Sequence, residues 1–147
     1  MDTVIRKQIH KLIHFFDTND PFRIAKGLGI IIVRYPLHGI RGFYHYFQRN
    51  HIIYIDERLT DHEARLVCAH ELGHMLLHKS SNAVFMNTKT HFNTTKYEIE
   101  ADSFAMNLLV RDEVILENIH LSTNQFSRLL GYEEKLLELR LKNFRNI

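Results

Sequence analysis

Residues 70–74 read His-Glu-Leu-Gly-His, the H-E-x-x-H pattern that binds zinc in many hydrolases. Residues four apart lie on one face of an α-helix, so His70 and His74 would point the same way and could hold one zinc ion. Glu71 would then reach a water at the metal and act as its general base. Although the chain has 11 histidines, composition gives only about 0.05 such patterns by chance. The pattern therefore predicts a zinc site rather than an amphipathic helix with surface histidines.

A third ligand is expected from the acidic segment at residues 98–102. Glu98 and Asp102 lie four residues apart and would share one helix face. A catalytic zinc site typically has three protein ligands and a water, so we assign Glu98 as the third ligand and Asp102 as the acceptor of a free ring N–H of a zinc-bound histidine. Two alternatives stay open. Thr95 and Glu98 also have the form of a capping box, and Glu100 is a second carboxylate, although it lies about 200° round the helix from Glu98.

The helix that carries H-E-x-x-H is expected to begin at Thr60. Thr60 and Glu63 have the S/T-x-x-E form of a capping box, and the helix should run to about Lys79. Four apolar side chains indicate that this helix is substantially buried: Leu72, Met75, Leu76 and Leu77. Polar residues on a buried helix need partners, which favours a metal site.

A second helix, from about Lys96 to Val110, is expected to carry Glu98 and Asp102. Residues 82–94 before it read as an irregular loop, long enough to indicate a functional role. His78 would form a hydrogen bond near the end of the first helix. If His78 or His91 instead supplied a fourth ligand, the zinc would be structural rather than catalytic.

The N-terminal part is expected to supply two helices and a sheet. The helices should span residues 4–16 and 21–26, and strands should follow at 30–35, 43–48 and 51–55. A tight turn at residues 49–50 would join the last two strands into a hairpin. His10 and His14 also lie four apart, but no carboxylate accompanies them, and a solvated helix face is the better interpretation.

The C-terminal part reads as short helical segments. A turn is expected at residues 112–118, followed by a helix after the capping box of Ser122 and Gln125 that stops at Gly131. The last helix should span residues 133–144. Its loose helix-turn-helix rhythm makes DNA binding an alternative role, but acidic and basic side chains are mixed there, which argues against phosphate tracking.

Composition limits the class of protein. A chain of 147 residues, 45% hydrophobic, can bury a proper core. The net charge of +2 and the lack of basic runs predict no direct nucleic-acid binding. Cys68 cannot form an internal disulfide and is expected to be a buried core residue. Because the sequence has neither a signal-peptide core nor an apolar stretch of about 18 residues, we expect a cytoplasmic protein without a membrane partner.

The two chemical motifs also occur together in a known family. The first is the H-E-L-G-H stretch with Leu77 and His78, and the second is Glu98-x-Glu100-Ala101-Asp102 with the apolar residues that follow. With the Asp-Pro entry segment before them, these motifs resemble the ImmA/IrrE family of small zinc peptidases over about residues 18–112. The family's helix usually ends Leu-Leu-Met-Pro, whereas residues 108–111 read Leu-Leu-Val-Arg. This departure alters how the helix ends and the edge of the substrate groove, but it touches no proposed ligand.

The resemblance implies a fold and a function. The fold would be α+β, a small zincin-like domain with about three mostly antiparallel strands packed on the H-E-x-x-H helix and further helices. The site would be gluzincin-like, with Zn²⁺ on His70, His74 and Glu98 and with Glu71 as general base. The activity would be that of an endopeptidase that cleaves a helix-turn-helix repressor of a phage, mobile element or stress response. The alternative is a non-catalytic zinc-containing module that sequesters a regulatory partner.

The domain organisation follows from these elements. The whole of residues 1–147 is expected to form one metallopeptidase domain, divided into an N-terminal part (1–58), zinc-site helices (60–110) and C-terminal helices (112–147). A peptide would lie in extended form along the hairpin at 43–55. Several side chains could stabilise the oxyanion, and their spacing does not select among them: Tyr46, Tyr54, Tyr97, His62 and His91.

Overall fold

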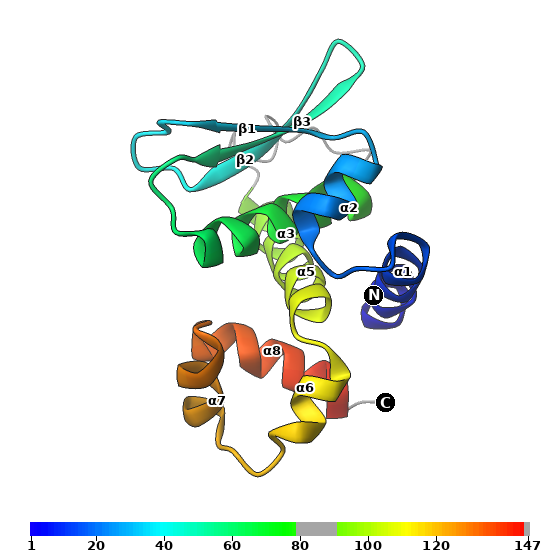
Figure 1. Ribbon diagram of the computed structural model, residues 1–147, viewed down its shortest axis with the longest axis vertical. Helices are drawn as coiled ribbons and strands as arrows, with labels where there is room; N and C mark the ends of the chain where they lie inside the picture. Colours follow the sequence, from blue (N-terminus) through cyan, green and yellow to red (C-terminus); the bar gives the residue numbers. More distant parts are fainter. Residues whose placement is uncertain (79–90, 146–147) are drawn as a thin grey trace.

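The computed structural model describes residues 1–78 and 91–145. Its helices are α1 (Asp2–Phe16), α2 (Pro21–Gly27), α3 (Asp61–Leu77), α5 (His91–Leu109), α6 (Asp112–Glu117), α7 (Thr123–Leu130) and α8 (Glu134–Arg145). Its strands are β1 (Ile31–Tyr35), β2 (Gly42–Phe47) and β3 (Asn50–Asp56). The sheet lies at one end of the molecule over α2, α3 and α5, and α6, α7 and α8 lie at the other end (Figure 1). The predicted α+β class is confirmed.

The sheet is mixed rather than mostly antiparallel. Its strand order is β1-β3-β2, with β3 antiparallel to β2 and parallel to β1. The predicted hairpin is present, and its two-residue turn is at Gln48 and Arg49, one residue earlier than expected. Both turn residues have positive φ, 49° and 65°, a conformation that matches the twist of a hairpin. Because β3 occupies the centre, β2 is an edge strand.

The capping box predicted at the start of α3 is present. The Thr60 hydroxyl accepts from the Glu63 N–H at 3.2 Å, and the Glu63 carboxylate accepts from the Thr60 N–H at 3.0 Å. The helix then runs for 17 residues, and His78 is its C-cap. Its buried side chains join one core with the sheet and α5, and Cys68 within it is fully buried, as predicted. Burial raises the pKa of the Cys68 thiol to about 12, so this side chain is a neutral packing group.

Helix α5 begins at His91, several residues before the expected start. Residues 91–94, predicted to be irregular, are therefore helical, and the rest of the predicted loop lies outside the described residues. Thr95 and Glu98 sit inside this helix, so the interpretation of Glu98 as a helix cap is wrong. The Thr-x-x-Glu spacing arises equally in a helix interior, so the pattern alone does not identify a cap.

Helices α3 and α5 pack closely because a glycine faces the contact. A Cβ on Gly73 would lie 3.0 Å from the Cβ of Phe104 and 3.1 Å from two of its ring carbons. Phe104 is fully buried and cannot swing away into solvent. The close approach brings the acidic face of α5 against the histidines of α3.

The C-terminal helices pack around a second apolar cluster that begins with Met106 on α5 and Val110 directly after it. The buried guanidinium of Arg140 on α8 donates through Nε to the Val110 carbonyl at 2.8 Å and bonds the Asp112 carboxylate. The predicted capping box at Ser122 and the left-handed stop at Gly131 are both present. Among the described residues, no helix combines the length and apolar character needed to cross a membrane.

Candidate metal centre

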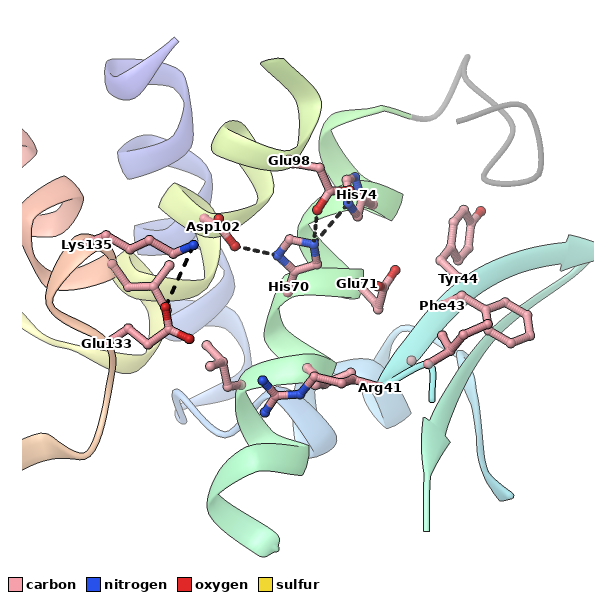
Figure 2. A pocket seen from close by; sticks show the side chains of 15 residues that line it. Arg41, Phe43, Tyr44, His70, Glu71, His74, Glu98, Asp102, Glu133 and Lys135 are labelled. Carbon is pink, nitrogen blue, oxygen red and sulfur yellow. Dashed lines mark hydrogen bonds and ion pairs between the residues drawn. The ribbon is translucent and has the colours of Figure 1, made fainter. Parts of the chain in front are cut away.

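Two histidines of α3 and one glutamate of α5 converge on a single point. Nε2 of His70 lies 2.9 Å from one carboxylate oxygen of Glu98, and Nε2 of His74 lies 2.8 Å from the other. The two Nε2 atoms are 3.1 Å apart, and the three ligand atoms all lie within 4.8 Å of one another (Figure 2). Two imidazoles and a carboxylate so arranged are suited to hold a metal ion.

Asp102 orients the first histidine. Its Oδ1 lies 2.8 Å from Nδ1 of His70, so the ring donates its Nδ1 proton to the carboxylate and directs Nε2, the nitrogen that would bind a metal ion, toward Glu98 and His74. Burial lowers the pKa of His70, but the hydrogen bonds to Asp102 and Glu98 outweigh this effect and raise it to about 10. Burial alone would raise the pKa of Glu98, but the hydrogen bonds to His70 and His74 hold it well below its usual range. The arrangement therefore draws positive charge to this point, as a metal site must.

The second histidine has a different partner. Nδ1 of His74 lies 3.2 Å from Nδ1 of His78, and Nε2 of His78 lies 2.9 Å from the Glu100 carboxylate. The ring of Tyr97 packs on His78 at 4.2 Å between centroids. Glu100 thus bonds His78 and not the group of His70, His74 and Glu98, which agrees with its position about 200° round α5 from Glu98. His78 forms the hydrogen bond that was expected near the helix end.

Glu71 lies beside the convergence point, on the side that faces β2 (Figure 2). Its side chain is buried, and this burial raises its pKa above the ordinary value, although the neighbouring histidines oppose the change. A carboxylate with a raised pKa takes up a proton more readily near neutral pH, which suits a general base. The structure thus brings all five residues of the predicted site together.

A cleft of about 770 Å³ opens over this group. One wall is the edge strand β2 with the residues before it, and the floor is α3 with Glu98 and Asp102 of α5. The far wall comes from the start of α8, where Glu133 and Lys135 lie across from Arg41 (Figure 2). The C-terminal part of the chain therefore lines the cleft beside the metal centre.

The residues considered for the oxyanion lie elsewhere. Tyr54 stacks on Phe43, Tyr97 packs on His78, and His62 bonds the Gly131 carbonyl. Like these three, Tyr46 is absent from the cleft lining, and the side chain of His91 lies outside the described residues. Tyr44 does line the cleft, with its hydroxyl 2.7 Å from Nδ1 of His51. The sequence pattern did not single out Tyr44, because every second residue of an aromatic strand looks alike.

Comparison with known proteins agrees with this centre. The profile of a peptidase family, described as the IrrE N-terminal-like domain, matches residues 25–142 and so includes most of the C-terminal helices. The chain is 36% identical over 149 residues to uncharacterized immunity region protein 2 of Bacillus phage phi105, covering 97% of this chain and 94% of that one. It is 28% identical over 115 residues to metallopeptidase ImmA of Bacillus subtilis (strain 168), covering 77% of this chain and 67% of that one. The chain therefore belongs to the ImmA/IrrE family of peptidases.

Proposed function

We propose that this protein is a zinc-dependent endopeptidase that cleaves a helix-turn-helix repressor. The observation that carries the proposal is the convergence of His70, His74 and Glu98 at the floor of an open cleft. Among the described residues this group has three members, which leaves a coordination position for water, as a catalytic zinc site requires. When bound, zinc would lower the pKa of a water and polarise the scissile carbonyl.

The chain's own residues would then do the following. His70, His74 and Glu98 hold the metal, and Asp102 keeps the His70 ring in the tautomer whose Nε2 is free. Glu71 accepts a proton from the attacking water and delivers it to the amine nitrogen of the leaving peptide. Its burial supports this role, because a raised pKa lets the same carboxylate first take up and then release a proton.

The cleft supports a peptide as the substrate. Strand β2 is an edge strand, and residues 42–44 of it line the cleft. Among the described residues β2 has a strand neighbour on one side only, so an extended peptide could pair with the main-chain groups of its other side and pass over the convergence point. The choice of a repressor as substrate is supported by the family and by the name of the phage relative, which places that protein in an immunity region.

A non-catalytic zinc module is the alternative, and the contacts disfavour it. A structural zinc is closed by four protein ligands. His78, the described residue considered as a fourth ligand, directs its two ring nitrogens to His74 and Glu100 instead.

The test is to incubate the zinc-loaded protein with helix-turn-helix repressors from its own genome, beginning with any that is encoded next to its gene, and to map the fragments by mass spectrometry. The parent should give one cleavage position. Glu71→Gln should keep zinc and lose cleavage, because the ligands remain and the base is gone. Glu117→Gln, the same change at an exposed carboxylate of α6, is the matched control and should cleave normally. Cleavage by Glu71→Gln at the parent rate would refute the mechanism, and a parent that binds the repressor without cutting it would favour the alternative.

A further inference from the structure

A chain of hydrogen bonds runs from the interior of the protein to His74. Glu100 and His78 are both almost fully buried, with side chains 8% and 3% exposed. The Glu100 carboxylate lies 2.9 Å from Nε2 of His78, and Nδ1 of His78 lies 3.2 Å from Nδ1 of His74. The other nitrogen of His74 faces Glu98 and His70. The proposed metal centre of His70, His74 and Glu98 gives no role to Glu100 and His78.

The directions of these hydrogen bonds follow from the groups involved. A carboxylate can only accept, so Nε2 of His78 carries a proton and donates it to Glu100. A neutral imidazole then has its lone pair on Nδ1, which accepts from Nδ1–H of His74. With its proton on Nδ1, His74 presents a free lone pair at Nε2, and a metal ligand needs this lone pair.

From this chain of contacts we infer that His78 and Glu100 are positioning residues that set the tautomer and ring orientation of His74 for metal binding. The inference rests on the proposed function, because it assigns His74 as a ligand. On this view each proposed histidine ligand is linked to a carboxylate of α5. His70 bonds Asp102 directly, whereas His74 reaches Glu100 through the imidazole of His78. Both carboxylates come from α5, the helix that carries Glu98.

The surroundings of His78 hold this arrangement in place. The ring of Tyr97 packs on it at 4.2 Å, and its own helix continues directly into it, with the His78 N–H bonded to the His74 carbonyl at 2.9 Å. The inserted histidine lies one helical turn beyond His74, and Glu100 lies two residues from both Glu98 and Asp102. The hydrogen-bonded chain Glu100–His78–His74, called the relay below, is thus built from α5 and the C-terminal end of α3, the same two helices that form the metal centre.

The test measures zinc affinity by competition with a chelating dye, in the absence of any repressor. His78→Phe keeps a ring in the Tyr97 contact but removes the acceptor, so its zinc affinity should fall about 10- to 100-fold. His78→Gln offers an oxygen acceptor and an N–H donor and should recover most of that loss. Glu100→Gln keeps the shape but removes the charge, and should weaken zinc binding less than His78→Phe. His62→Phe, the same substitution at the exposed start of α3, is the matched control and should bind zinc like the parent.

Unfolding of each variant with excess chelator separates positioning from folding. If His78→Phe does not fold, His78→Gln and Glu100→Gln decide the question. Imidazole nitrogen NMR of the zinc-loaded parent should show His78 protonated on Nε2 and His74 on Nδ1. Parent-like zinc affinity in His78→Phe, an equal loss in His78→Gln and His78→Phe, or the opposite tautomer would overturn the relay. A parent that binds no zinc would overturn both proposals, whereas one that binds zinc but cuts no repressor overturns only the function.

Discussion

Replacing Gly73 with alanine should force α3 and α5 apart beside the metal centre. The added Cβ would lie 3.0 Å from the Cβ of Phe104, so one helix must give by a few tenths of an ångström. Phe104 is fully buried, and it shares α5 with Glu98. Any displacement of α5 therefore moves the Glu98 carboxylate relative to His70 and His74, whose contacts to it are 2.9 and 2.8 Å.

Two effects of opposite sign decide the stability of Gly73→Ala. Alanine in a helix interior is favoured over glycine by about 1 kcal/mol. Overpacking a core costs about 1–3 kcal/mol. The net expectation is a loss of about 0–2 kcal/mol, which in a domain of this size lowers the melting temperature by up to about 8 °C. Zinc affinity should fall as well, because the third ligand is displaced.

The assay is thermal unfolding by circular dichroism with excess chelator, followed by zinc titration. Arg65 is exposed on the same helix, so the difference between Arg65→Ala and Arg65→Gly gives the helix-propensity term without a contact. Subtracting that difference from the Gly73→Ala result leaves the cost of the contact with Phe104. The reasoning would be refuted if Gly73→Ala raised the melting temperature by the full difference between Arg65→Ala and Arg65→Gly and bound zinc like the parent.

Four further outcomes are expected. Metal analysis of the parent should show one zinc ion per chain, and Glu98→Ala should lose it; retention of zinc there with its loss in Glu100→Ala would show that the wrong carboxylate was chosen. Removing zinc with a chelator should lower the melting temperature, since free ligand at about 100 times its dissociation constant stabilises by about 2.7 kcal/mol. Thr60→Ala should cost about 1 kcal/mol in urea unfolding, because the Glu63 N–H loses its acceptor. The pKa of Asp112 lies below its ordinary 3.8 because the bond to Arg140 outweighs the effect of burial, so this pair stabilises the fold fully above that value and less as pH falls below it. The stability gap between the parent and Asp112→Asn, measured by urea unfolding against pH, should therefore shrink in acid, and a constant gap would contradict the assignment.

Features encoded within one helical turn were predictable from the sequence. The capping boxes at Thr60 and Ser122 and the stop at Gly131 each depend on residues a few positions apart, and all three are present. The strands and the hairpin pairing of β2 with β3 were also predictable, but the parallel pairing of β1 with β3 was not. The apolar run at 30–35 suits either direction, and only the position of β3 in the centre makes its pairing with β1 parallel.

Part of the candidate site was also predictable from local sequence patterns, and part was not. The spacing of His70 and His74 and the pairing of Glu98 with Asp102 follow from helix periodicity, and the structure places these residues together. The link from Glu100 to His74 through a third imidazole depends on how α5 is rotated against α3. That rotation is set by core packing, including the approach of Gly73 to Phe104, and no local pattern reports it.

The edge strand β2 has a consequence for which proteins can be cut. Free main-chain groups at a sheet edge attract any other strand, and proteins usually protect such edges. Here α3 and the start of α8 wall the cleft in beside residues 42–44. A peptide that pairs with β2 in this cleft would do so as one extended chain, whereas a strand already hydrogen-bonded in a folded sheet would bring its neighbours with it. Under the proposed function, a substrate segment would have to open locally before it could pair with β2, and cleavage would select among candidate proteins by the local stability of their own chains.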